Sequence, residues 1–411
     1  MIGTIRTTGL MAATALATLA LAQPAMALDA EEFVDRIATV YAVMGYDLSF
    51  GPATLSGDTI VVDGVTINIK GAGVDPVALD TELTFTGVVE YEDGSYSAET
   101  LTVPDIDTQF AADPVGRLTL VDISAEDLWL PPEGDTSGVA LLQLMGRMST
   151  GALTVTRDGV EVIKIDSMEA ASAFTFSEDD DTLEALDSTL SINNIWADLS
   201  TVGEEDPEAA EIINALGLTR ISGNISQISS WTMDDGHIVV DEFLFDFADV
   251  GALDITADIT GFTPNLLDKI YALQSSGLDP ESEQAQAQAM MAGMEIAQAL
   301  SIVSASIRYD DAGLTPKLLD MFAAQSGADR SSFVEGLKSM LPGVIAQSGI
   351  PALGDIVVPP VSSFLDDPKS LEIAVRPANP TSVLVLAAAA SNPASLIQAL
   401  GLTVTANAKS K

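Results

Sequence analysis

The chain has 411 residues, of which 17 are lysine or arginine and 60 are aspartate or glutamate, so its formal net charge is −43. A field of this sign repels nucleic acids and anionic lipid surfaces, and we expect no nucleic-acid partner. The chain has no cysteine, which excludes disulfides, thiol nucleophiles, iron–sulfur clusters and thiolate zinc sites.

The acidic residues are scattered along the chain, which is typical of a solvated surface screened by salt. The densest run, residues 177–182, is the nearest candidate for calcium binding. It lacks the alternating aspartates and the glutamate at position 12 of a calcium loop. We therefore expect no metal site and no cofactor.

The first 27 residues have the organisation of a cleavable signal peptide. Arg6 supplies a positive n-region, and residues 9–22 are uncharged and small or apolar. Ala25 and Ala27 form an A-x-A cleavage site, and the apolar run is shorter than the roughly 20 residues that span a bilayer. We expect cleavage after Ala27, export to the periplasm or beyond, no lipid anchor and no integral membrane segment.

An amphipathic helix is expected at the start of the mature chain. Its apolar residues recur at helical spacing and precede Gly45; they are Phe33, Ile37, Val40, Tyr41 and Met44.

Residues 47–262 show the alternating pattern of β-strands. Four Asp-Gly pairs, which suit two-residue hairpin turns, lie between apolar runs: Asp63-Gly64, Asp93-Gly94, Asp158-Gly159 and Asp235-Gly236. At the first pair the strand could also run straight through. A short acidic helix, from Pro207 to Leu216 and ending at Gly217, interrupts the region.

From residue 263 the pattern becomes helical and contains an internal repeat. Residues 263–268 (TPNLLD) recur as residues 315–320 (TPKLLD), with the threonine placed as an N-cap and the proline at the first helical position. Residues 213–219 are echoed by 397–403, both reading as a helix end with a glycine cap.

Four further segments follow. Residues 281–298 suit a helix, whose Met290, Met291 and Met294 we expect to pack on the sheet; the alternative is that they face a ligand or partner. Residues 351–360 have the composition of a linker. We expect a strand at 371–375 and a last helix at 393–400.

The predicted fold is mainly β (α+β): one large, twisted antiparallel sheet covered by capped helices, with a helix-rich C-terminal third. It comprises a signal peptide (1–27), an N-terminal helix with an antiparallel β region (28–262), and a strand–helix repeat region (263–411) packed on the same sheet.

Several catalytic chemistries are excluded. His237 is the only histidine, it follows a turn as a surface residue would, and no G-x-S-x-G or Ser-x-x-Lys motif is present. No phosphate-binding loop occurs, and zinc catalysis lacks ligands. A carboxylate-only glycosidase mechanism stays open. No catalytic, cofactor-binding or metal-binding residue is nominated, and we expect a protein that is not an enzyme.

Three segments resemble a group of uncharacterised proteins exported by alphaproteobacteria: residues 307–320, 364–373 and 392–405. More distantly, the repeated strand pattern resembles AsmA/TamB-like envelope proteins. That resemblance implies a long curved sheet and, for some members, lipid handling between membranes.

The expected function is that of a non-enzymatic, envelope-associated binding protein with a groove between sheet and helices for a lipid or a protein partner. Two alternatives stay open: a structural or interaction protein without a small ligand, and a carboxylate-based hydrolase of glycosidase type.

Overall fold

The computed structural model describes residues 28–69, 76–179, 182–204, 206–274, 282–347, 350, 352–390 and 392–409. The expected cleavage residues Ala25 and Ala27 lie outside this part, as does the middle of the acidic run 177–182.

A single antiparallel sheet of 21 strands dominates the molecule and confirms the mainly β prediction. Among the described residues, no helix combines the length and the apolar character that crossing a membrane requires.

The strands are, in chain order, β1 (Tyr46–Phe50), β2 (Ala53–Ser56), β3 (Thr59–Ile69), β4 (Val77–Thr86), β5 (Val89–Glu90), β6 (Tyr96–Val103), β7 (Ile106–Ala112), β8 (Val115–Leu120), β9 (Ile123–Leu130), β10 (Met145–Thr150), β11 (Leu153–Arg157), β12 (Val160–Ile165), β13 (Ser167–Phe176), β14 (Leu183–Asp198), β15 (Arg220–Thr232), β16 (His237–Phe247), β17 (Gly251–Thr260), β18 (Ser301–Asp311), β19 (Ser370–Val375), β20 (Thr381–Ser382) and β21 (Thr403–Ala406).

The helices are α1 (Ala30–Val43), α2 (Gly138–Leu142), α3 (Pro207–Leu216), α4 (Pro264–Gln274), α5 (Glu283–Ala299), α6 (Leu314–Gln325), α7 (Arg330–Gln347), α8 (Leu353–Asp366), α9 (Val383–Ala389) and α10 (Pro393–Leu400), with a 3₁₀ turn η1 (Leu199–Glu204).

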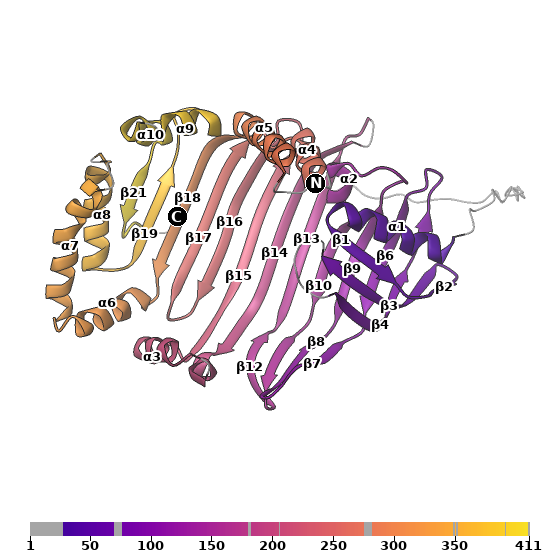
Figure 1. Ribbon diagram of the computed structural model, residues 1–411, viewed down its shortest axis with the longest axis horizontal. Helices are drawn as coiled ribbons and strands as arrows, with labels where there is room; N and C mark the ends of the chain where they lie inside the picture. The colour runs from indigo at the N-terminus through magenta and orange to yellow at the C-terminus, as the bar shows by residue number, and fades with distance from the viewer. Residues whose placement is uncertain are drawn as a thin grey trace, which may run out of the picture.

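Strand pairing runs continuously from β3 through β4, β6, β9, β10 and β13 to β19 and β21. A side branch of β7, β8, β11 and β12 joins the main sheet at β14. Helices α4, α5, α9 and α10 lie along one end of the long strands, α3 and α6 along the other end, and α7 and α8 beyond β19 (Figure 1). The helices therefore border the C-terminal half of the sheet more than they cover it.

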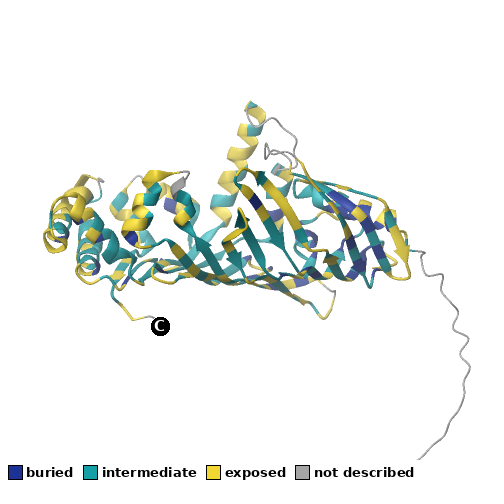
Figure 2. Ribbon diagram, turned by 90° about the horizontal axis from the view of Figure 1, so that it is seen from below, coloured by how far each residue is buried: buried dark blue, intermediate teal, exposed yellow. Residues whose placement is uncertain are grey.

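The densest core lies in the N-terminal part. Phe33 of α1 is almost fully buried, and its ring meets Phe85 and Tyr96 edge-on at centroid distances of 5.0 and 5.6 Å. A second, smaller cluster joins Trp231 to Leu267 of α4 and neighbouring leucines. Figure 2 shows the buried residues concentrated around the end that carries α1, while the rest of the sheet is half-buried or exposed.

The predicted turns hold at three of the four Asp-Gly pairs. Pairs 93–94, 158–159 and 235–236 each lie in the turn that joins two adjacent antiparallel strands. At the remaining pair, Asp63-Gly64, the strand β3 runs straight through. The φ of Gly64 is 88°, and the strand has a bulge between Asp63 and Val65. The glycine there bends a strand and does not end it.

Most predicted helices also hold. Helix α1 covers the expected apolar stripe, and α3 and α10 end at Gly217 and Gly401, both with left-handed φ. Residues 351–360 are not the predicted linker, because most of them belong to α8, which contains Pro359 and Pro360.

The second copy of the repeat starts its helix differently from the prediction. Helix α6 begins at Leu314, so Thr315 lies inside the first turn and is not the N-cap. The carboxylate of Asp311 takes the capping role, since it accepts hydrogen bonds from the backbone N–H groups of Gly313 and Thr315 at 2.9 and 2.7 Å.

The methionines of α5 do not pack on the sheet as predicted. Met290, Met291 and Met294 are 69%, 73% and 56% exposed. Helix α5 contacts α4 and α9 at the end of the long strands, and none of its residues is buried. These three methionine side chains face away from the protein core.

Candidate functional site

The long strands β13–β19 separate apolar from polar side chains. Because successive side chains of a strand point to opposite faces, residues opposite one another in register share a face. Trp231 pairs with Leu186, and both pack against Leu267 of α4, so their face is the one that carries the helices. On this face Tyr309 of β18 also meets Phe364 of α8, with ring centroids 6.4 Å apart. We call it the open face.

A row of small residues crosses the open face. From β13 to β19, each strand contributes one residue that lies opposite the next one in register, and none of the seven is larger than valine. The residues are Ser172, Ser188, Ser229, Val240, Ala257, Ala305 and Val375. We call this set the small-residue row. It runs perpendicular to the strands across the half of the sheet that the helices border.

Mostly larger and mostly apolar residues flank the small-residue row on both sides. Towards α4 the neighbouring row is Phe174, Leu186, Trp231, Ile238, Ile259 and Ile302. On the other side the neighbours are Ala170, Leu190, Gln227, Phe243, Ile255, Ile307 and Ile373, of which Ala170 is small and Gln227 is polar. We infer that the small side chains between two rows of mostly larger ones leave a shallow groove, whose floor includes three serines and whose walls are apolar apart from Gln227.

This groove is open to solvent. Every member of the small-residue row is half-buried, and Ile307 and Ile373 of its wall are 52% and 48% exposed. The six inter-strand spacings between Ser172 and Val375 correspond to about 29 Å, at ~4.8 Å each. Extended exposed surfaces rich in apolar side chains commonly mark binding sites.

At the β13 end, the groove leads into a hollow of about 630 Å³. Its lining is largely apolar and includes three aromatic side chains, although the whole chain has only 5% aromatic residues. The lining residues are Asp127, Trp129, Gln143, Gly146, Ser172, Phe174 and Phe176. Ser172 belongs to both the small-residue row and the hollow, so the two are continuous.

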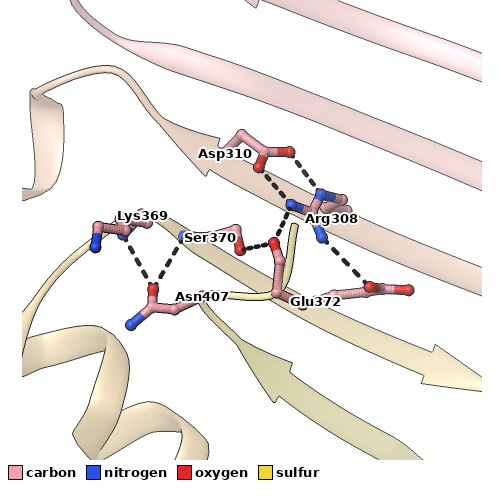
Figure 3. Close-up of polar contacts among 7 residues, drawn as sticks. Arg308, Asp310, Lys369, Ser370, Glu372 and Asn407 are labelled. Carbon is pink, nitrogen blue, oxygen red and sulfur yellow. Dashed lines mark hydrogen bonds and ion pairs between the residues drawn. The ribbon is translucent and has the colours of Figure 1, made fainter. Parts of the chain in front are cut away.

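The opposite face of the same strands is polar. On it, Arg308 donates from Nε and Nη2 to both carboxylate oxygens of Asp310 at 2.6 Å, and its Nη1 lies 3.5 Å from Glu372 (Figure 3). These contacts raise the pKa of Arg308, with the Asp310 hydrogen bond as the main cause. Burial raises the pKa of the neighbouring Asp254, and Glu242 and Asp310 add to that effect.

The C-terminal tail is fastened to this polar face. Asn407 accepts hydrogen bonds at Oδ1 from the backbone N–H groups of Lys369 and Ser370, at 3.2 Å each, and Arg308 donates to the carbonyl of Ala408 at 3.0 Å (Figure 3). These polar contacts tie β21 to β18 and β19. Asn407 also donates from Nδ2 to the carbonyl of Ser363 at 3.2 Å, which ties the tail to α8 as well.

His237, the only histidine, also lies on the polar face. Its Nε2 is 2.8 Å from Oδ1 of Asp258, and both side chains are about one-third exposed. Within the described ranges, no three His, Cys, Asp or Glu residues are grouped to hold a metal ion.

A family model described as an uncharacterised protein matches residues 244–407. The match includes residues 244–247 at the end of β16 and all of β17–β21, and with them three members of the small-residue row, Ala257, Ala305 and Val375. A search of curated proteins finds no match to the chain.

None of the groove residues could be nominated from the sequence. Alternation within each strand indicates which residues share a face, but the groove arises only when small residues of seven strands fall opposite one another. Their alignment depends on pairing register, and bulges shift that register in β15–β16, β16–β17 and β17–β18.

Proposed function

We propose that this protein binds the hydrocarbon chain of a lipid in the groove of the open face, as a non-enzymatic component of the bacterial cell envelope. The observation that carries the proposal is the small-residue row, which lies between two rows of mostly large, mostly apolar side chains. A single extended apolar chain fits such a surface, because it needs length and few polar partners.

The dimensions support a lipid chain. The hydrocarbon core of a bilayer is about 30 Å thick and holds two acyl chains end to end, so one chain takes about half of the groove. Each methylene group removed from water contributes about 0.8 kcal/mol, and a long chain therefore gains substantial affinity without any charged contact.

The export signal and the resemblance to alphaproteobacterial exported proteins and to AsmA/TamB-like proteins support a periplasmic location and an envelope role. The strongly negative net charge disfavours anionic lipids as ligands, and neutral or zwitterionic lipids suit the groove better.

A protein partner is the second candidate, and α5 favours it. Three exposed methionines form an adaptable apolar surface that could bind a partner helix.

Equilibrium binding of saturated monoacylglycerols of increasing chain length tests the proposal. These ligands are uncharged, so the net charge of the protein does not oppose them. We expect the affinity to rise with each added pair of carbons, by up to about tenfold. Absence of binding, or an affinity that does not depend on chain length, would reject the hydrocarbon groove and favour the protein partner.

A further inference from the structure

The hollow at the β13 end of the groove combines three aromatic rings with one carboxylate. Trp129, Phe174 and Phe176 contribute the rings, and those of Phe174 and Phe176 lie 6.4 Å apart. The faces of aromatic rings attract cations, most strongly in tryptophan, and quaternary ammonium groups are commonly bound by such sets of rings.

The carboxylate of the hollow belongs to Asp127 of β9. This residue is exposed, and in the described part of the chain no hydrogen bond or ion pair is assigned to its carboxylate. Its φ of 53° is uncommon for a residue other than glycine, and asparagine is one of the few replacements that tolerate it.

Gly146 of β10 makes room for Asp127. A Cβ atom at Gly146 would lie 2.9 Å from Cβ of Asp127 and 3.2 Å from its Oδ2. The Asp127 side chain therefore lies against the bare backbone of Gly146, at the wall of the hollow. Any side chain at Gly146 would push the carboxylate from this place.

We propose that the hollow binds an ammonium head group, with a quaternary ammonium such as choline as the best fit. The aromatic rings contact the methyl groups and Asp127 neutralises the charge. The strongly negative protein also concentrates cations near its surface. The assignment of the hollow as the head-group end of a lipid site rests on the proposed function, whereas its preference for ammonium ions does not.

Asp122 provides a matched control for Asp127. It lies immediately before the same strand with the same φ of 53°, and a Cβ at Gly151 would lie 2.8 Å from its Oδ2. It does not line the hollow. Replacing either aspartate by asparagine removes one negative charge from the same kind of backbone position.

The test is a calorimetric titration of the purified protein with tetramethylammonium chloride and with 3,3-dimethylbutanol, a neutral molecule of the shape of choline. We expect the cation to bind and the neutral molecule to bind at least about fivefold more weakly. Asp127→Asn, Gly146→Ala and Phe176→Leu should each weaken cation binding by about three- to tenfold, and Asp122→Asn should leave it unchanged. Equal affinity for both ligands, or equal effects of Asp127→Asn and Asp122→Asn, would overturn the proposal.

A second titration distinguishes a lipid head group from a free ammonium ion. Dodecylphosphocholine, kept below its micelle concentration, should bind more tightly than choline if the ligand is a lipid, and Asp127→Asn should weaken both. Equal binding of the two would support the ammonium site while contradicting the hydrocarbon groove. Monoacylglycerol binding without any tetramethylammonium binding would support the groove and overturn the ammonium site.

Discussion

Arg308 and Asp310 lie two residues apart on β18 and form a double hydrogen bond on the polar face, with both N···O distances 2.6 Å. The side chain of Arg308 is only 14% exposed and also contacts Glu372 and the carbonyl of Ala408. This one guanidinium therefore connects β18, β19 and the C-terminal tail. It stabilises the end of the sheet whose other face forms the groove.

Replacing Arg308 by methionine should lower the free energy of unfolding by about 1–3 kcal/mol, because it leaves two partly buried carboxylates without their partner. Urea denaturation measures the change. Arg117→Met is the control, since Arg117 and Asp107 form an equally short but exposed pair. We expect no measurable change there, and equal losses in the two variants would contradict the structural role of Arg308.

The hydroxyl of Tyr309 should ionise late. Burial, together with a hydrogen bond to Asp311, raises its pKa to about 12 from the ordinary value of 10.0. The unfolded chain loses this proton first, so the stability that the buried phenol contributes is complete below pH 10 and falls as the pH rises towards 12. Spectrophotometric titration of the wild type and Tyr309→Phe should show a late-ionising phenol that is missing from the variant. The variant should also lose less stability between pH 10 and 12, and a normal ionisation of this phenol would contradict its burial.

Helix α6 should depend on Asp311 more than on Thr315. Asp311 accepts two backbone N–H groups of the first turn and the hydroxyl of Tyr309, at 2.7–3.0 Å. Asp311→Ala should cost about 1–2 kcal/mol of unfolding free energy, and Thr315→Ala clearly less. Thermal denaturation of both variants measures the difference. The reverse order would restore Thr315 as the cap that the sequence pattern indicated.

That cap shows where sequence patterns mislead in this protein. The Thr-Pro motif is common to both copies of the repeat, yet the second copy has an acidic residue four positions before its threonine that caps the helix instead. Similarly, residues 351–360 have the composition of a linker, but α8 continues through Pro359 and Pro360 and buries Phe364 against Tyr309. In each case a contact with a neighbouring element outweighs the local preference.

Local signals with a strict conformational requirement were more reliable. Gly217 and Gly401 end their helices with left-handed φ, and the turns at Gly94, Gly159 and Gly236 also have positive φ. The groove has no comparable local signal. It depends on how seven strands align, and one residue of slippage would place the same side chains on the other face.

The most direct test of the groove compares two identical substitutions on one strand. Ala257 of β17 belongs to the small-residue row, whereas Ala252 of the same strand pairs with Asp246 and Asp310 on the polar face. Both alanines are half-buried. We would measure the affinity for a 16-carbon monoacylglycerol in Ala257→Leu and Ala252→Leu, and confirm by circular dichroism that both fold.

A leucine at position 257 fills the floor of the groove and should weaken binding by about tenfold or more, which corresponds to roughly two methylene groups displaced from their contacts. A leucine at position 252 should leave the affinity unchanged. Equal affinities in the two variants would contradict the hydrocarbon groove.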